Sequence, residues 1–171
     1  MKHHFVELPV STRDGRFTAR YSENGLAELD FPKARSAGRA DRTTRRGVSA
    51  NNVPAQIRNW HRTTESALKK ILAGRKPAKF PPFDAAGTEF QKSVWREMRE
   101  IPPGKTKSYG EIAQAIGRPK AVRAVGGACG ANPIPVLVPC HRILAANQKI
   151  GGFSGGLDWK RRLLIREGVR I

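Results

Sequence analysis

A proline-rich stretch at residues 79–83 divides the chain into two parts with different hydrophobic patterns, and this change constrains the fold most. Before it, residues 17–31 alternate apolar and polar side chains around an Asn-Gly turn, which predicts two antiparallel strands. Residues 53–72 then place apolar side chains at helical spacing. We therefore expect an α+β protein with a small sheet-and-helix domain at residues 1–79 and a mainly helical domain at residues 80–171.

The second part reads as short helices separated by turns. Thr88 can cap a first helix, and Ser108, with Glu111 three residues further on, has the capping-box pattern at the start of a second. A third helix is expected over residues 120–129, after a Gly-Arg-Pro break. Two short helices across a tight turn are typical of a helix-turn-helix, whose second helix can reach DNA. Many helical hairpins bind nothing, so the spacing alone leaves that function open.

The segment at residues 33–52 differs from its surroundings. Its basic side chains stand among Ala, Gly, Ser and Thr, with almost nothing apolar to bury. Such a composition favours a mobile loop. A loop that adds non-specific affinity for DNA and a loop peculiar to the source species are both open interpretations, and we favour the second.

The net charge of the whole chain is +18, from 32 Lys and Arg against 14 Asp and Glu, and both halves are basic. A field of this sign attracts polyanions, nucleic acid first, with an affinity that falls as salt rises. Adaptation for solubility, ribosome association and binding to acidic lipid are the alternatives. The net charge by itself does not indicate which reaction the protein performs.

The sequence also limits where the protein works. No apolar run approaches the roughly 18 residues that a membrane span needs, and the first residues lack the apolar stretch of a signal peptide. Two cysteines are too few for a disulfide scaffold and fit a reducing compartment. We expect a cytoplasmic protein, or a nuclear one if the source cell has a nucleus, that does not bind membranes.

Cys140 is the strongest candidate for a reactive side chain. Pro139 fixes the backbone just ahead of it and favours the first turn of a helix, where amide groups stabilise a thiolate. His141 and Arg142 add positive charge nearby, so a lowered thiol pKa is expected. Adjacent side chains point apart, so a bridging water between Cys140 and His141 is the natural hypothesis. The alternative is that Cys140 is a small buried hydrophobic residue.

Several motifs beyond residue 80 together resemble those of the O6-alkylguanine-DNA alkyltransferases, also called methylated-DNA–protein-cysteine methyltransferases. The Val-Pro-Cys-His-Arg sequence at 138–142 is similar to the active-site signature of that family. The other matching segments are 87–91 with 94–95, 101–111, 123–128 with 132–133, 152–157 and 163–168. The resemblance covers about residues 80–171 in the family's order. It implies an RNase H-like first domain and a winged-helix-like second domain that carries the active site.

The resemblance also implies an activity. The family performs direct-reversal DNA repair, in which an alkyl group moves irreversibly and stoichiometrically from O6-alkylguanine in duplex DNA to the protein's own cysteine. Cys140 would be the acceptor, His141 its base through water, and Glu167 the group that orients and charges the histidine. Tyr109 would donate a hydrogen bond or a proton to the leaving guanine, and Asn132 would brace the active-site turn. Activity on O4-alkylthymine is left open.

Access to the lesion requires that the nucleotide leave the base stack. By resemblance Arg123 is the finger that takes its place, and Ala124, Gly126 and Gly127 let the recognition helix lie close to the DNA, with Tyr109 beside them. Ser154 belongs to a glycine-containing loop that closes over the extruded base. The residues expected around that base are Pro135, Val138, Ile143, Phe153, Ser154 and Gly155.

The chain departs from some relatives at its start. No cysteine precedes Cys129, and His3, His4 and His61 alone make a poor zinc site, so we expect neither a metal nor a cofactor. Cys129 matches no acceptor position and is interpreted as a packing residue. The expected partner is duplex DNA carrying O6-alkylguanine, bound by a monomer, with cooperative binding left open. The alternative functions are a non-catalytic sensor of alkyl lesions and a basic helix-turn-helix regulator.

Overall fold

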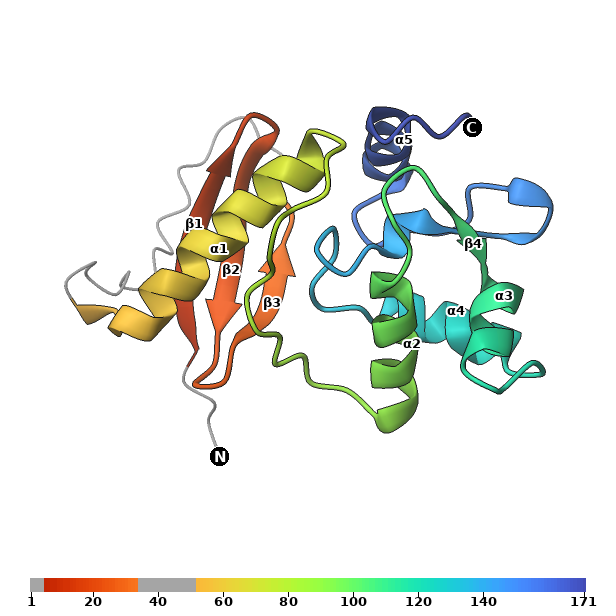
Figure 1. Cartoon of the computed structure of the whole chain (residues 1–171), viewed down its shortest axis with the longest axis horizontal. Coiled ribbons are helices and arrows are strands. Elements are labelled where there is room, and N and C mark those ends of the chain that lie inside the picture. The colour runs from red at the N-terminus through yellow and green to blue at the C-terminus, as the bar shows by residue number, and fades with distance from the viewer. Residues whose placement is uncertain (1–4, 34–51) are drawn as a thin grey trace.

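The computed structural model describes residues 5–33 and 52–171. Three antiparallel strands, β1 (Val6–Thr12), β2 (Gly15–Tyr21) and β3 (Leu26–Asp30), form a sheet in that order, and helix α1 (Ala55–Leu72) lies across one face of it (Figure 1). The predicted strand pair and helix are confirmed, as is the α+β class. The basic segment predicted to be a loop lies almost entirely outside the described residues.

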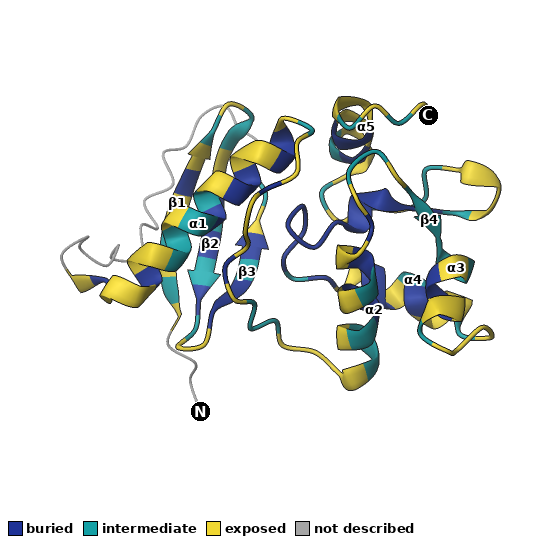
Figure 2. Cartoon of the chain, in the orientation of Figure 1, coloured by how far each residue is buried: buried dark blue, intermediate teal, exposed yellow. Residues whose placement is uncertain are grey.

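Alternation along the strands explains why the sheet and the helix pack together. Phe17, Ala19 and Tyr21 of β2 are fully buried, while Thr18 and Arg20 between them are half-buried. Figure 2 shows this change of burial along β2. Ile57 and Leu68, at helical spacing on α1, are buried in the same core. Burial of each such side chain contributes about 1.5–3 kcal/mol.

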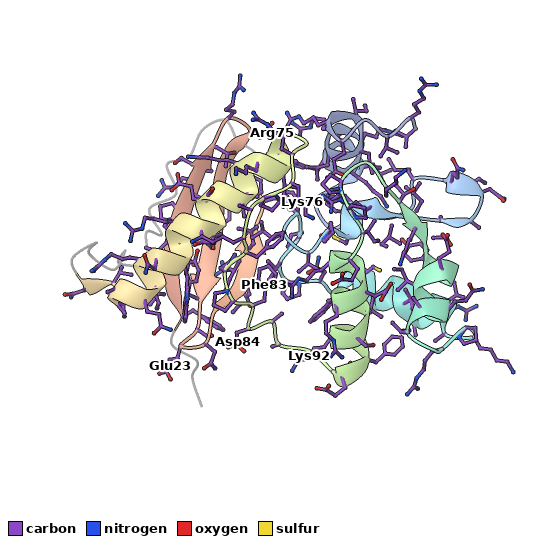
Figure 3. The ribbon with its side chains drawn as sticks, in the orientation of Figure 1. Glu23, Arg75, Lys76, Phe83, Asp84 and Lys92 are labelled. Atoms are coloured by element: carbon purple, nitrogen blue, oxygen red, sulfur yellow. The ribbon has the colours of Figure 1, made fainter. Side chains whose placement is uncertain are left out.

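The proline-rich stretch runs along the edge of β3. The amide of Leu26 donates to the carbonyl of Pro82 at 2.8 Å, and the amide of Asp84 donates back to the carbonyl of Leu26 at 2.8 Å. Figure 3 shows Phe83 and Asp84 on this connection, between the sheet and the second group of helices. The connection is therefore hydrogen-bonded to the sheet. The division of the chain between residues 79 and 80 stays a prediction.

Beyond that connection the chain is mostly helical. The predicted side-chain caps are confirmed, because Thr88 with Gln91 and Ser108 with Glu111 both form complete capping boxes. The elements are α2 (Glu89–Arg99), β4 (Lys107–Ser108), α3 (Tyr109–Ala115), α4 (Val122–Gly130), a 3-10 turn (Cys140–Arg142), β5 (Ile143–Leu144), a second 3-10 turn (Ala146–Gln148) and α5 (Leu157–Arg166). Strands β4 and β5 pair in parallel, which ties the start of α3 to the residues after Cys140.

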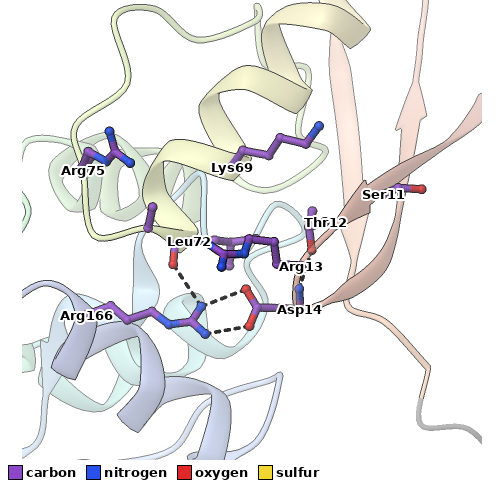
Figure 4. Close-up of a pocket in the computed structure, with 9 residues that line it drawn as sticks. Ser11, Thr12, Arg13, Asp14, Lys69, Leu72, Arg75 and Arg166 are labelled. Atoms are coloured by element: carbon purple, nitrogen blue, oxygen red, sulfur yellow. Dashed lines mark hydrogen bonds and ion pairs between the residues drawn. The ribbon is translucent and has the colours of Figure 1, made fainter.

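The two parts meet where α1 ends and α5 ends. Arg166 donates hydrogen bonds to both carboxylate oxygens of Asp14, at 2.7 and 2.8 Å, and one to the carbonyl of Leu72 at 2.9 Å, beside an open cleft (Figure 4). A Cβ on Gly74 would lie 2.0 Å from the carbonyl oxygen of Arg166, so this junction has no room for a side chain. Among the described residues no helix has the length and apolar character to cross a membrane.

Candidate active site

A cavity of about 150 Å³ lies between α3, α4, the turn at Cys140 and the loop before α5. This volume suits a single small group rather than a drug-sized ligand, whose pockets begin at roughly 300 Å³. The residues that line it are Tyr109, Gly126, Cys129, Gly130, Cys140, Gly152, Phe153 and Ser154. Of these, five were predicted site residues: Tyr109, Gly126, Cys140, Phe153 and Ser154.

Asn132 holds the turn that presents Cys140. Its side-chain oxygen accepts a hydrogen bond from the amide of Ile134 at 3.0 Å, and its side-chain nitrogen donates to the carbonyl of Val138 at 2.9 Å. Between them Val136 has a φ of 74°, a left-handed conformation that is strained for a β-branched residue. The two hydrogen bonds of Asn132 span this strained residue, so they hold the chain in the conformation that leads to Cys140.

Cys140 is only 5% exposed, and burial raises the pKa of its thiol above the ordinary value. A hydrogen bond from Asn132, the charge of Lys160 and the backbone amides of Cys140 and His141 act in the opposite direction without reversing it. The expectation of a lowered pKa is therefore wrong for this structure. The loss of hydration disfavours the thiolate more than the 3-10 turn and the neighbouring charges stabilise it.

His141, Glu167 and Arg142 form a buried network behind Cys140. Nε2 of His141 lies 2.9 Å from Oε1 of Glu167, while Arg142 donates three hydrogen bonds to the same carboxylate and one to the carbonyl of Ile101. Burial alone would raise the pKa of Glu167, but the hydrogen bonds from His141 and Arg142 and the charge of Arg142 bring it down to about 2. Arg142 is thus a partner of Glu167, not the free charge near Cys140 that its sequence position indicated.

The protonation of His141 follows from the same network. Burial lowers the pKa of His141, and the attraction of Glu167 opposes that effect only in part, so the imidazole is neutral near pH 7. Glu167 was expected to orient His141 and to keep it charged. In the structure it is placed to orient the histidine, but the expectation that it keeps His141 charged is wrong. When Nε2 carries the proton toward Glu167, Nδ1 is the acceptor. Nδ1 is buried and has no hydrogen-bond partner among the described residues, so it is free to accept a proton.

Lys160 is a site residue that nothing in the sequence pattern indicated. Its ammonium is fully buried and donates to the carbonyls of Ile143 at 2.6 Å and Gly152 at 3.2 Å. Burial lowers its pKa to about 8, and its charge favours the thiolate of Cys140. A lysine in an exposed, basic helix such as α5 is ordinarily solvated, so only the fold reveals that this one faces the site.

Tyr109 and helix α4 form another wall of the cavity. Tyr109 is half-buried at the start of α3, and burial raises the pKa of its hydroxyl, so it is a hydrogen-bond donor near neutral pH. On α4, Arg123, Ala124 and Gly127 are exposed, whereas Gly126 turns toward the cavity. Exposed small residues beside an arginine leave this face of the helix open to a close-packed partner.

Cys129 is buried against Met98, with 3.6 Å between the two sulfurs, and burial raises its pKa to about 12. It therefore packs as predicted, although it also touches the cavity. The structure holds no group of three or more His, Cys, Asp or Glu suited to a metal among the residues it describes. His61, weighed as a zinc ligand, lies 3.0 Å from the hydroxyl of Tyr21, while His3 and His4 fall outside the described residues.

Comparison with known proteins decides the family. The model of the "6-O-methylguanine DNA methyltransferase, DNA binding domain" matches residues 89–169. A methylated-DNA–protein-cysteine methyltransferase of Methanosarcina acetivorans is 60% identical over 146 residues, which are 85% of this chain and 87% of the relative. The chain belongs to the methylated-DNA–protein-cysteine methyltransferase family. A second relative with that name, from Methanosarcina mazei, is 46% identical over 98% of this chain and 97% of its own.

Solved structures of the family share the whole fold. An O6-methylguanine methyltransferase of Mycobacterium tuberculosis superposes with a TM-score of 0.70 and 32% identity, covering 96% of this chain and 93% of that one. The OGT protein of the same organism, crystallised in complex with DNA, gives a TM-score of 0.69 and 34% identity over 93% and 90% of the two chains. The likeness therefore extends over the sheet-and-helix part as well as the helical part.

The remaining residues expected around the base in this methyltransferase fold lie outside the cavity. Pro135 and Gly155 line a neighbouring hollow between β3 and the loop before α5, and Val138 lies in a third depression near α2. Ile143 is fully buried and contributes its carbonyl to Lys160. The structure thus brings the catalytic candidates and Phe153 and Ser154 together, and leaves these four residues in supporting positions.

Proposed function

We propose that the protein repairs O6-alkylguanine in duplex DNA by moving the alkyl group to Sγ of Cys140, in a single turnover. The observation that carries this is the position of Cys140, which lines a base-sized cavity and precedes in the chain the histidine that pairs with Glu167. The bond from sulfur to the alkyl carbon forms as the bond from that carbon to O6 breaks. The products are an S-alkylcysteine and an unmodified guanine.

His141 and Tyr109 would handle the proton that this exchange displaces. Nδ1 of His141 is the free acceptor for the thiol proton, directly or through a water, while Glu167 stabilises the imidazolium that forms. The Tyr109 hydroxyl donates to the purine ring as negative charge develops there. The proton balance closes because the proton lost by the thiol is finally held by guanine. Neither a metal nor a cofactor has a part in these steps.

DNA would be held by the face of α4. Arg123, Ala124 and Gly127 are exposed on it, Gly126 adjoins the cavity, and the net charge of +18 favours a polyanion. Because the lesion lies within the base stack, the nucleotide must be extruded into the cavity, at a cost of a few kcal/mol. Insertion of Arg123 into the vacated space would offset part of that cost. That the related OGT protein was crystallised in complex with DNA supports DNA as the partner.

The same chemistry suggests the setting in which the protein works. A free thiol acceptor must stay reduced, so we expect the cytoplasm, or a nucleus where there is one. Each molecule carries a complete set of catalytic groups, so it would act as a monomer on alkylated duplex DNA.

The acceptor can be tested with a duplex that carries one isotopically labelled O6-methylguanine. We expect Cys140→Ser to bind this duplex and to take up no label. Cys129→Ser, which removes the other cysteine of the chain, should retain transfer. Label on the Cys140→Ser protein would place the acceptor elsewhere, with Cys129 the first candidate. A wild-type protein that binds the lesion tightly but never takes up label would be a lesion sensor.

A further inference from the structure

The loop from Gly151 to Gly156 forms one wall of the cavity, through Phe153 and Ser154. It lies next to the catalytic histidine, since the ring centroids of Phe153 and His141 are 6.5 Å apart in an edge-on arrangement. Its first part is tied to α5, because Lys160 donates to the carbonyl of Gly152. The position of the rest of the loop determines the shape of the space above Cys140.

The outer side of this loop packs against Phe31, which follows β3 at the end of the N-terminal sheet. The ring of Phe31 lies 5.7 Å from that of Phe153 and 5.1 Å from that of Trp159 on α5, measured between centroids. On its other side it contacts Phe17 of the sheet core at 5.6 Å. Phe31 therefore joins the buried core of the sheet to the wall of the cavity.

Gly155 shows how close this contact is. A Cβ built on Gly155 would lie 2.5 Å from Cε2 and 2.6 Å from Cζ of Phe31, and 3.0 Å from Cε1 of Phe153. No side chain fits there unless the Phe31 ring moves. The glycine is therefore required by the approach of an aromatic ring from the sheet, in addition to any flexibility it lends the loop.

The end of β3 also supports the second flank of the site. The amide of Leu29 donates to the carbonyl of Pro133 at 2.9 Å, next to Asn132, which braces the turn that carries Cys140. Residues 29–32 accordingly face both the loop and the Asn132 turn across a shallow hollow. One strand end therefore contacts the segments on both sides of the cavity.

We propose that Phe31 is a positioning residue for guanine: packed against Phe153 and Gly155, it holds the loop at 151–156 in the position that closes over the base. The N-terminal sheet would then help determine how tightly the base is held, although it contributes no group to the reaction. This inference rests on the proposed function, because it assigns Phe31 a part in binding the same guanine.

A free O6-benzylguanine base is the appropriate probe, because it depends on the cavity and not on DNA contacts. We expect Phe31→Ala to raise the base concentration at half-maximal rate about tenfold and to change the maximal rate much less, since the thiol and His141 remain in place. Phe31→Tyr, which keeps the ring, should restore binding. Val10→Ala, a buried substitution opposite Phe17 in strand β1, leaves the Phe31 ring in place and is the control for lost stability alone.

A double-mutant cycle tests the contact itself. Gly155→Ala should weaken binding of the base by forcing the Phe31 ring away, and it should cost much less when Phe31 is already alanine. Independent, additive losses would overturn the inference, as would unchanged half-saturation in Phe31→Ala or an equal change in Val10→Ala. If Phe31→Ala does not fold, Gly155→Ala and Phe31→Tyr still probe the contact. A wild-type protein that never reacts with the base or with alkylated duplex would instead refute the proposed function.

Discussion

Cys140 combines two properties that oppose each other: it is the nucleophile of the proposed reaction, and it is buried where the thiolate is disfavoured. A protonated thiol is a poor nucleophile, which protects the acceptor until a base fills the cavity. Its activation then depends on proton acceptance by His141 and on the nearby charge of Lys160. The reactivity of the site thus depends on the adjacent His141 and on Lys160, which a later element, α5, brings to the site.

Lys160→Met tests the electrostatic part of this dependence. We expect transfer near pH 7 to fall about tenfold, because the thiolate loses a favourable neighbouring charge. The pKa of Lys160 is lowered to about 8, so the wild-type protein loses the same charge above that pH. The difference between variant and wild type should therefore shrink as the pH rises beyond 8. Rate measurements across this range decide the point: a constant difference would mean that Lys160 acts only by holding Ile143 and Gly152.

Glu167 makes a separate prediction about stability. Its pKa falls from an ordinary 4.5 to about 2 in the folded protein, so the unfolded state binds the proton more readily. This contributes roughly 3 kcal/mol to the free energy of unfolding, fully present above pH 4.5 and lost as the pH falls through 2. Denaturant unfolding at about pH 7 and about pH 3 should show that Glu167→Gln removes much of this acid dependence.

The same variant leaves Arg142 buried without its charged partner, so we expect it to be less stable by about 3–5 kcal/mol near neutral pH. Glu23→Gln, at an exposed position, is the matched control and should change neither quantity. An acid dependence in Glu167→Gln equal to that of the wild type would show that other groups dominate it.

At the scale of elements, local signals in the sequence predicted the fold well. The Asn-Gly turn, the caps at Thr88 and Ser108 and the periodicity of α1 each depend on neighbouring residues, and the structure confirms them. Strand β1 was not delimited from the sequence, and its Pro9 is a residue that argues against a central strand; Pro9 falls on the exposed side of the alternation, and as an edge strand β1 tolerates proline.

The parts of the site that could not be predicted depend on contacts across the fold. The partners of Lys160 lie 8 and 17 residues away, and Arg142 meets Glu167 across 25 residues. The packing of Phe31 on Phe153, in the loop before α5, joins residues much further apart in the sequence. The family resemblance indicated Cys140, His141 and Glu167, but not Arg142 as a partner of Glu167 or the support from the sheet.

The junction of α1 and α5 gives a prediction about elements. Gly74→Ala should destabilise the protein by more than the roughly 1–2 kcal/mol that a left-handed residue costs, because its Cβ would overlap the carbonyl of Arg166. Gly168→Ala is the matched control, since it also has a positive φ but has no atom within 4 Å of the added Cβ. Thermal unfolding compares the two variants directly. Equal losses would show that the close approach of α1 and α5 adds nothing to stability.

At the scale of the whole molecule, the cavity would hold the base and the proposed DNA-binding face of α4 would help to extrude it, so the two roles can be tested separately. Arg123→Ala should slow transfer from duplex DNA by more than about tenfold while leaving transfer from free O6-benzylguanine nearly unchanged, because the free base needs no extrusion. Parallel rate measurements on the two substrates test this. Equal losses would remove Arg123 from the role of finger and assign it to the pocket.

The most direct measurement is the intact mass of the wild-type protein after incubation with excess duplex that contains one O6-methylguanine, followed by peptide mapping. The proposed function predicts one added methyl group per molecule, located on Cys140, with no further uptake and none from unmodified duplex. An unchanged mass, a methyl group on another residue, or repeated turnover without modification of Cys140 would contradict it.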